Sequence, residues 1–293
     1  MLNTPFDTSG AVALEALRAN VRYAIDAGVA GFLVPALASE VGKLSRDERM
    51  EMVRAVVAEA RGKAVVIGGA SAPTSDERCA LATMFTGLGC DGVLAAIAFE
   101  DEAQYTRDIT ALAATAPGFL MVQDWDFNGF GAPVDVVARL FEEIDAFRCL
   151  KVEVVPAGVK YSALIAATNG RLHVSGGWAV QQIVEALDRG VHAFMPTGLH
   201  HSYCAIVRRY LRGDRAGALA LHEELLPILA FSNQHLDISI HFFKRLLHRQ
   251  GIYPTASSRE PILPFDAYHE RMADALIERA IALEARVKAE EAR

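Results

Sequence analysis

The chain has 293 residues, of which 52% are hydrophobic and 22% are charged, and its formal net charge is −7. This composition allows a large core, and the length fits one α/β barrel of about 250 residues with an addition. No lysine- and arginine-rich cluster typical of nucleic-acid binding is present, and no apolar run reaches the ~20 residues that span a bilayer. We therefore expect neither a nucleic acid nor a membrane as partner.

Four widely spaced cysteines form no CxxC pair, and the N-terminus carries no signal-peptide pattern. Both observations argue against a disulfide framework and favour a reducing, cytoplasmic location.

Strand and helix patterns alternate along the chain. After a turn-like start, apolar residues recur at helical spacing over 11–27, and the apolar run 30–35 is typical of a strand buried on both faces. The pattern then predicts helices over 45–61, 73–88, 100–116, 133–146, 158–168 and 179–189, and strands over 64–69, 92–98, 119–123, 148–156, 172–175 and 193–196. Only helices follow, over 201–212, 214–249 and 265–292.

Seven βα units predict an α/β fold, a (βα)₈ TIM barrel with a C-terminal helical extension. The first strand would be a shortened remnant that ends at Thr4-Pro5-Phe6. An open doubly wound sheet is the competing fold, but no Gly-x-Gly-x-x-Gly follows the first strand. We expect a catalytic barrel over 1–200 and C-terminal helices over 201–293, where the apolar stretch 219–247 favours a subunit interface.

Lys151 is the only lysine within a predicted barrel strand, and Glu153 follows two residues later. Strand side chains alternate, so the two point to the same side, roughly 7 Å apart along the strand. A buried lysine loses its proton more easily, and its neutral amine can attack a ketone to form a Schiff base. Glu153 could then move a proton. The residues alone leave a buried ion pair without chemistry equally open.

Active sites of such barrels lie at the C-terminal ends of the strands, which gathers further candidates without any motif. They are Ala38 and Ser39 after the strand 30–35, Gln123 to Asp126 after 119–123, Ser175 to Trp178 after 172–175, and His200 and His201 near the last strand. Ser39 and nearby N–H groups could hold a substrate carboxylate, whereas Gly176 and Gly177 could let backbone approach the substrate. A divalent metal held by the two histidines with Asp124 or Glu153 is the alternative of a different class.

Several short stretches occur in the order found in one enzyme family. They are Thr4-Pro-Phe, Ala36-Leu-Ala-Ser-Glu40, Lys43-Leu-Ser, Glu48-Arg, Val66-Ile-Gly-Gly, Gly89-Cys-Asp-Gly-Val93, Lys151, Ser175-Gly-Gly, Arg189-Gly-Val-His-Ala-Phe-Met-Pro-Thr-Gly198, Gly213-Asp, Lys244, Gly251 and Arg259-x-Pro261. Over about residues 4 to 262 the chain thus resembles the dihydrodipicolinate synthase / N-acetylneuraminate lyase family of class I aldolases. The resemblance implies that Lys151 forms the Schiff base with a 2-keto acid, that no further cofactor is needed, and that the protein is a homo-oligomer, a tetramer or a dimer.

The chain also departs from the family's pattern. Gln123 stands in place of the usual relay tyrosine, and Leu37 and Ala38 replace the paired threonines. A glutamate two residues after the lysine resembles the 2-keto-3-deoxy sugar-acid dehydratase and aldolase branch, so Glu153 is expected to be the general acid and base. Ser39, Ala38, Gln123, Ser175, Gly176 and Gly177 would bind the substrate.

The expected reaction is dehydration of a 2-keto-3-deoxy sugar acid. The alternatives are retro-aldol cleavage to pyruvate and an aldehyde, a condensation like that of dihydrodipicolinate synthase, or a non-catalytic protein that binds a keto acid.

Overall fold

The computed structural model describes residues 1–115, 117–177 and 181–292. The chain forms two compact units. One combines residues 1–65 with 196–293, and the other comprises residues 66–195. The expected division at residue 200 into barrel and C-terminal helices stays a prediction.

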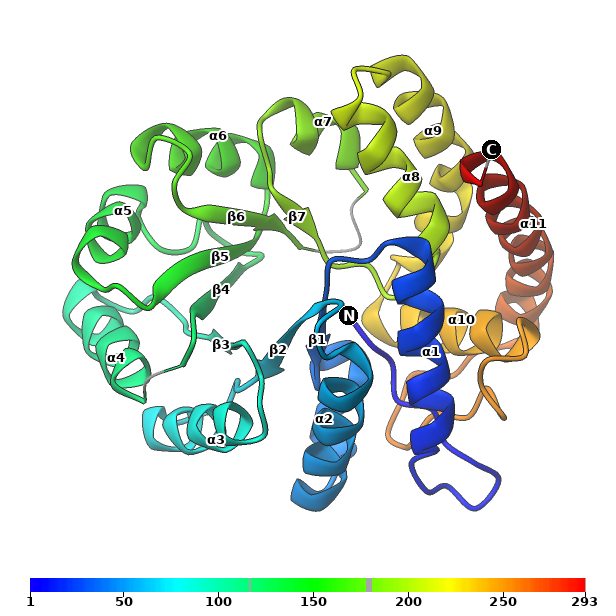
Figure 1. The fold of residues 1–293 in the computed structure, drawn as a ribbon, viewed down its shortest axis with the longest axis horizontal. Coiled ribbons are helices and arrows are strands. Elements are labelled where there is room, and N and C mark those ends of the chain that lie inside the picture. The colour runs from blue at the N-terminus through cyan, green and yellow to red at the C-terminus, as the bar shows by residue number, and fades with distance from the viewer. Residues whose placement is uncertain (116, 178–180, 293) are drawn as a thin grey trace. The chain divides into compact units, whose positions relative to one another are not determined.

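The unit of residues 66–195 alternates strands and helices, as the sequence pattern predicts. Its strands are β2 (Val65–Gly69, whose first residue belongs to the other unit), β3 (Gly92–Ala96), β4 (Leu120–Asp126), β5 (Phe147–Val154), β6 (His173–Gly176) and β7 (Ala193–Phe194). Its helices are α3 (Ser75–Gly87), α4 (Glu102–Ala114), α5 (Val134–Glu143), α6 (Ala157–Ala167) and α7 (Ile183–Asp188). Consecutive strands pair in parallel from β2 to β7, and Figure 1 shows the helices along the outer side of these strands.

The register of this sheet aligns three of the candidate residues. Gln123 on β4 lies opposite Lys151 on β5, and Lys151 lies opposite Ser175 on β6. Partners at one level of a parallel sheet carry their side chains on the same face. The side chains of Gln123, Lys151 and Ser175 therefore form one row, and Glu153 stands two residues further toward the C-terminal end of the same face.

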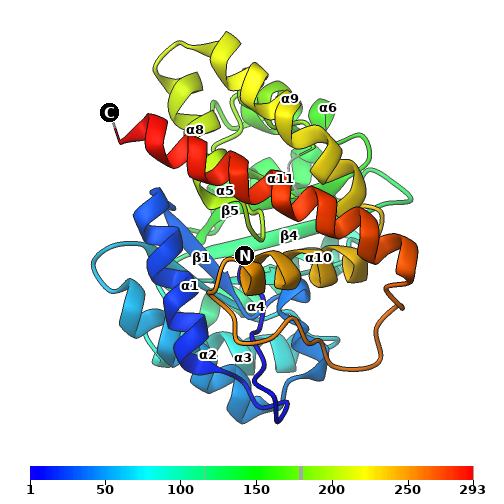
Figure 2. The ribbon, with the colours of Figure 1, turned by 90° about the vertical axis from the view of Figure 1, so that its right-hand side faces the viewer.

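The other unit contains the N-terminal elements and all of the C-terminal helices. They are α1 (Leu14–Ala27), β1 (Gly31–Val34), the short 3₁₀ turns η1 (Leu37–Ser39) and η2 (Val41–Lys43), α2 (Arg46–Ala60), α8 (His200–Leu211), α9 (Arg215–Ser232), α10 (Leu236–Arg249) and α11 (Ala267–Glu291). Helix α2 begins with a reciprocal capping box between Ser45 and Glu48, as the sequence predicts. Figure 2 shows α11 running alongside α8 and α9, against which it packs.

Three elements differ from the sequence prediction. Residues 4–6 form no strand: the N-terminal segment contacts β1 through the Leu2 N–H, which donates to the Leu33 carbonyl at 3.3 Å, and Phe6 forms an isolated bridge to Val12. Strand β4 continues to Asp126, where a loop was expected, because it pairs with β5 along its whole length. The helix predicted over 214–249 is interrupted at residues 233–235, where the His235 ring accepts a hydrogen bond from the Asp237 N–H and caps α10.

The apolar stretch 219–247 is mostly buried within its own unit, although Leu226 is exposed. The helices packed together there account for much of the apolar surface that suggested a subunit interface, and the oligomer stays a prediction. None of the helices in the described ranges is both long enough and apolar enough to cross a bilayer.

Candidate active site

Lys151 and Glu153 form a buried ion pair on one face of β5. The Lys151 Nζ atom lies 2.8 Å from the Glu153 Oε2 atom, and the two side chains are 5% and 9% exposed. The two charges are thus mutually compensated in a site with little water, where a proton can pass from the ammonium to the carboxylate and leave a neutral amine. A neutral amine is the form that attacks a carbonyl carbon.

Gln123 holds the carboxylate from the neighbouring strand. Its Nε2 group donates a hydrogen bond to Glu153 Oε2, the same oxygen that faces Lys151. Gln123, which stands where the family has a relay tyrosine, therefore contacts Glu153, the carboxylate that is expected to take over the role of the tyrosine. An amide does not titrate, so Gln123 can orient the carboxylate but cannot relay a proton itself.

Two consecutive glycines, Gly176 and Gly177, make close approaches on the two faces of the sheet beside Glu153. A Cβ atom on Gly177 would lie 1.9 Å from the Glu153 Cγ atom and 2.5 Å from its Oε1 atom. A Cβ atom on Gly176 would meet the Phe194 ring at 2.9 Å and the Tyr161 hydroxyl at 3.3 Å. Each glycine is thus required by a close approach, Gly177 by the catalytic candidate itself.

Ser175 has a buried hydroxyl with no hydrogen-bond partner in the described ranges. It lies level with Lys151 and on the same face. Buried hydroxyl groups are nearly always hydrogen-bonded, so an unused one beside a reactive amine is available to a ligand. The role of Ser175 in substrate binding stays a prediction.

A pocket of about 360 Å³ adjoins Glu153 at the C-terminal end of β5. The first turn of α6 and the stretch Gln181–Arg189 complete its wall. The sequence analysis missed its outer residues, which are Phe127, Tyr161, Gln181, Gln182, Glu185 and Arg189. They lie beyond the strand ends, in the loops and in the helices that follow. The rule that active sites lie at the strand ends therefore does not predict them.

Of these residues, Tyr161 has its hydroxyl beside Gly176. Its side chain is buried on α6, and burial together with the negative charge of Glu153 raises the pKa of Tyr161 to about 12. The hydroxyl is therefore neutral at ordinary pH.

Asp124 does not belong to this face. It lies opposite Val152 in the register, and its Oδ2 atom is 2.5 Å from the Nζ atom of Lys160 on α6. Asp124 is only 2% exposed because β4 extends past it and α6 covers it. Trp125, by contrast, lies opposite Glu153 and is largely exposed. Trp178 is outside the described residues.

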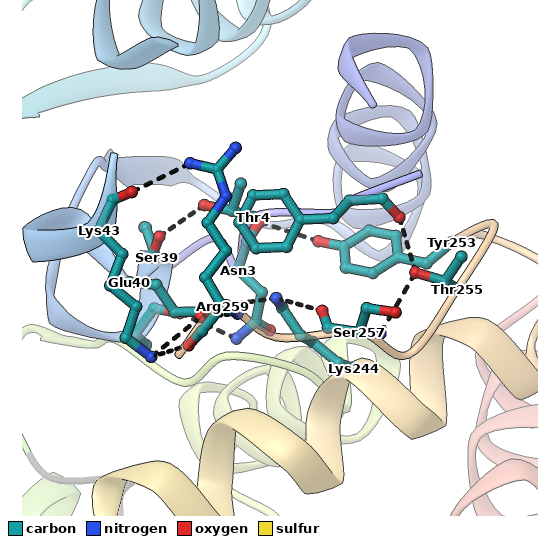
Figure 3. Close-up of polar contacts among 12 residues, drawn as sticks. Asn3, Thr4, Ser39, Glu40, Lys43, Lys244, Tyr253, Thr255, Ser257 and Arg259 are labelled. Carbon is teal, nitrogen blue, oxygen red and sulfur yellow. Dashed lines mark hydrogen bonds and ion pairs between the residues drawn. The ribbon is translucent and has the colours of Figure 1, made fainter. Parts of the chain in front are cut away.

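Ala38 and Ser39 lie in the other unit, in the turn η1 that follows β1. Figure 3 shows this turn tied to the N-terminal segment: Asn3 donates to the Ala38 carbonyl at 3.0 Å and Thr4 donates to the Ser39 carbonyl at 2.6 Å. The Ser39 hydroxyl donates to the Leu2 carbonyl at 2.5 Å and accepts from the Ala36 N–H at 3.0 Å. The Ser39 N–H also donates to the Ala36 carbonyl at 2.8 Å, so the hydroxyl and the N–H of Ser39 are both engaged in shaping the turn.

Glu40, at the end of η1, is the centre of a buried cluster. Its carboxylate pairs with Lys244 of α10, lies 3.3 Å from the Lys43 Nζ atom and accepts the Arg259 N–H at 2.9 Å (Figure 3). Burial lowers the pKa of Lys244 to about 8. The αL conformation of Glu40 is held by these contacts, so the cluster fixes where the turn 36–40 ends.

The two histidines considered as metal ligands lie in the first turn of α8. The His200 Nε2 atom is 3.2 Å from the Asn20 side-chain oxygen, and burial lowers the pKa of His200 to about 3. The His201 N–H donates to Glu284 at 3.1 Å. In the described residues, no three histidine, cysteine, aspartate or glutamate side chains lie close enough together to hold a metal ion.

Comparison with known proteins decides the family. The model of the dihydrodipicolinate synthetase family matches residues 1–280. The chain belongs to the dihydrodipicolinate synthetase family. It is 29% identical over 245 residues to a 4-hydroxy-tetrahydrodipicolinate synthase of Nitrobacter hamburgensis, with 78% of each chain covered, and 30% identical over 237 residues to that of Sorangium cellulosum, with 78% of this chain and 77% of the relative covered.

Solved structures of the family have the same fold. The dihydrodipicolinate synthase of Rhodopseudomonas palustris has a TM-score of 0.87 at 20% identity, with 94% of this chain and 95% of that chain covered. The 4-hydroxy-tetrahydrodipicolinate synthase of Methylacidiphilum fumariolicum has a TM-score of 0.86 at 21% identity, with 98% and 96% covered. The predicted fold class is confirmed, and the chain is a lyase of the class I aldolase type that the family comprises.

Proposed function

We propose that the chain forms a Schiff base between Lys151 and a 2-keto acid and dehydrates a 2-keto-3-deoxy sugar acid. The observation that carries the proposal is the buried Lys151–Glu153 pair at 2.8 Å, with Gln123 bound to the same carboxylate oxygen. An amine, an acid-base group and its orienting amide occur together on one face of the sheet.

The reaction begins when the Lys151 ammonium passes its proton to Glu153. The amine adds to the C2 carbonyl of the substrate, and Glu153 returns its proton to the resulting C2 hydroxyl, which leaves as water and gives a protonated imine. Glu153, ionised again, removes a proton from C3, and the electrons of the C–H bond enter the imine to form an enamine. The enamine then expels the C4 hydroxyl, to which Glu153 returns the proton, so one water is lost. Hydrolysis of the remaining imine releases the unsaturated keto acid and restores the lysine.

Ser175 would orient the substrate. Its unpartnered hydroxyl lies level with Lys151 and can bind the C1 carboxylate or a substrate hydroxyl. Gly177 leaves room for the Glu153 side chain.

Borohydride trapping tests the imine. Incubation with pyruvate and borohydride, followed by peptide mass spectrometry, is expected to give a reduced adduct on Lys151 and none on Lys160, a second buried lysine in the same unit. Binding of pyruvate without any adduct on Lys151 would exclude the covalent mechanism and favour a protein that only binds a keto acid.

Product identity separates the reactions that share this imine. Dehydration gives a keto acid that has lost one water, whereas retro-aldol cleavage gives pyruvate and an aldehyde. The relatives bear the name of 4-hydroxy-tetrahydrodipicolinate synthase, so a condensation that consumes pyruvate and an aldehyde is the second candidate. Release of pyruvate from a 2-keto-3-deoxy sugar acid, with no dehydrated product, would replace dehydration by cleavage.

A further inference from the structure

The pocket beside Glu153 bears on which keto acid enters the site, and the reasoning rests on the proposed function. Glu153 lines it, and the Glu153 carboxylate also faces the amine that would hold C2 of the substrate. In the proposed reaction Glu153 acts at C3 and C4, so the carbon atoms beyond C4 would enter the pocket that Glu153 lines. The volume of about 360 Å³ is at the small end of ligand pockets, enough for a short carbon chain.

The charges that line this pocket are already paired. Arg189 Nε donates to Glu185 Oε1 at 2.9 Å, and Arg189 Nη1 donates to the Ser162 hydroxyl at 2.8 Å. The pair packs on the first turn of α6: a Cβ atom on Gly158 would lie 2.6 Å from Glu185 Oε1 and 3.0 Å from Arg189 Nε. The guanidinium is thus held by a carboxylate and a hydroxyl rather than presented as an open anion site.

Glu153 and Lys151 form the second compensated pair. Among the described residues that line the pocket, Arg189 is the single lysine or arginine, and two carboxylates line it as well, Glu153 and Glu185. A carboxylate at the far end of a substrate would meet the like charges of Glu153 and Glu185 without gaining an unpaired cation, which disfavours its binding.

The remaining wall suits an uncharged hydroxylated chain. Val155, Val159 and Phe127 give an exposed apolar side that can cover the C–H face of such a chain. Gln181 and Gln182 offer amides that donate to and accept from hydroxyl groups. Tyr161 adds a neutral hydroxyl, since its pKa is raised to about 12.

We infer that this pocket receives an uncharged tail of the substrate, and that the chain selects keto acids with a single carboxylate over those with a second carboxylate at the far end. The Glu185–Arg189 pair sets this preference, because it neutralises the one cation in the pocket wall.

Two six-carbon 2-keto-3-deoxy acids test the inference, one that ends in CH₂OH and one that ends in a carboxylate. The rate at which each gives a borohydride-reduced adduct on Lys151 is measured, with pyruvate as the reference. We expect the acid with the neutral end to react at least about tenfold faster. Equal rates, or a faster reaction of the dicarboxylate, would overturn the inference, and so would trapping of pyruvate with neither longer acid. If pyruvate itself gives no adduct, the proposed function fails instead.

A variant identifies the residues responsible. Glu185→Gln leaves the Arg189 charge uncompensated, and the ratio of the two rates is expected to move toward the dicarboxylate by about tenfold. Glu142→Gln is the matched control, since Glu142 pairs with Arg171 on the surface of the same unit and lies outside the pocket. The ratio should stay at the wild-type value in the control. An unchanged ratio in folded Glu185→Gln would show that the pair does not set the preference.

Discussion

Two lysine–carboxylate pairs lie on opposite faces of strands β4 and β5. Lys151 and Glu153 share the face that carries Ser175, and Lys151 has Glu153 as its one ion-pair partner in the described ranges. Lys160 and Asp124 lie on the other face, where Lys160 also donates to the carbonyls of Phe130 and Ala132. Each pair joins a buried lysine to a buried carboxylate, but the hydrogen-bonding capacity of the ammonium is used differently.

The difference separates a group that can react from a group that holds structure. An ammonium has three N–H donors, and Lys160 directs all of them to oxygen atoms of the protein. It thereby fixes the loop 127–132 against α6. Lys151 has fewer oxygen partners in the described ranges, and it lies beside an unpartnered hydroxyl and close to a pocket. Burial of a lysine therefore predicts chemistry only when its donors are left for a substrate.

Replacement of Lys151 is expected to have the largest effect, a loss of turnover. Lys151→Met keeps the aliphatic stem and removes the amine, so turnover of any 2-keto acid should fall at least about 10⁴-fold because no imine can form. The melting temperature should fall less than in a Lys160→Met variant, since Glu153 keeps its bond from Gln123. The measurement is turnover with borohydride trapping. Turnover within tenfold of the wild-type value would contradict the imine mechanism.

Replacement of the carboxylate separates imine formation from proton transfer. Glu153→Gln preserves size and the contact with Gln123 but cannot take the C3 proton, so turnover is expected to fall about 10²- to 10⁴-fold. The adduct with pyruvate should still be trapped on Lys151. Near-normal turnover would remove Glu153 from the mechanism, whereas loss of the adduct as well would assign Glu153 to imine formation.

A methyl group at Gly177 disturbs Glu153 without touching its chemistry. Gly177→Ala would place Cβ 1.9 Å from Glu153 Cγ, so the carboxylate must move away from Lys151 and turnover is expected to fall about 100-fold. Gly87→Ala is the matched control, because a Cβ there meets nothing within 4 Å and α3 should tolerate alanine. Equal activity of the two variants would show that Glu153 does not depend on the close approach to Gly177.

Removal of Lys160 should affect stability where removal of Lys151 affects activity. Lys160→Met leaves the buried Asp124 carboxylate and two carbonyls without their donor, so the free energy of unfolding is expected to fall by about 3–5 kcal/mol. Denaturant unfolding measures this, with the exposed Lys63→Met as control. The double variant Lys160→Met with Asp124→Leu should recover part of the loss, because it removes the unpaired charge as well. A stability loss below 1 kcal/mol would contradict the assigned role.

Much of this arrangement could be predicted from the sequence. Alternating strand and helix patterns located most elements of the described ranges to within a few residues, except the strand expected at 4–6 and the single helix over 214–249. The two-residue spacing put Lys151 and Glu153 on one face. The register that aligns Gln123 and Ser175 with Lys151 could only be anticipated in general, through the rule that strand ends meet at one edge.

The rest depends on contacts between distant segments. No sequence pattern near Asp124 predicts its ion pair with Lys160, 36 residues later. A carboxylate after a strand is usually solvated. The Glu185–Arg189 pair has ordinary helical spacing, and only the packing of Gly158 on it places it in the wall of a pocket. The Ser39 hydroxyl likewise donates a hydrogen bond to the distant Leu2 carbonyl, and no local sequence pattern predicts this contact.

A partly exposed pair gives the smallest effect and completes the comparison. Arg259 Nη2 lies 2.5 Å from Glu48 Oε1, and both side chains are about one quarter exposed. The Arg259 guanidinium lowers the pKa of Glu48 to about 2, from 4.5. Since the folded-state pKa is the lower one, this pair stabilises the fold above pH 4.5, and the stabilisation is lost as the pH falls from 4.5 toward 2.

Glu48→Gln should therefore cost roughly 1 kcal/mol at pH 7, less than the shift alone suggests because water screens the pair. The variant should also show a flatter decline of stability between pH 4.5 and pH 2, because it lacks the carboxylate that titrates there. Urea unfolding at several pH values measures both effects. Glu51→Gln, which removes the more exposed partner of Arg54 in the same helix, is the control and should stay within about 0.5 kcal/mol of wild type. The same pH dependence in Glu48→Gln as in wild type would mean that this ion pair contributes nothing measurable, and that only the buried pairs matter to the fold.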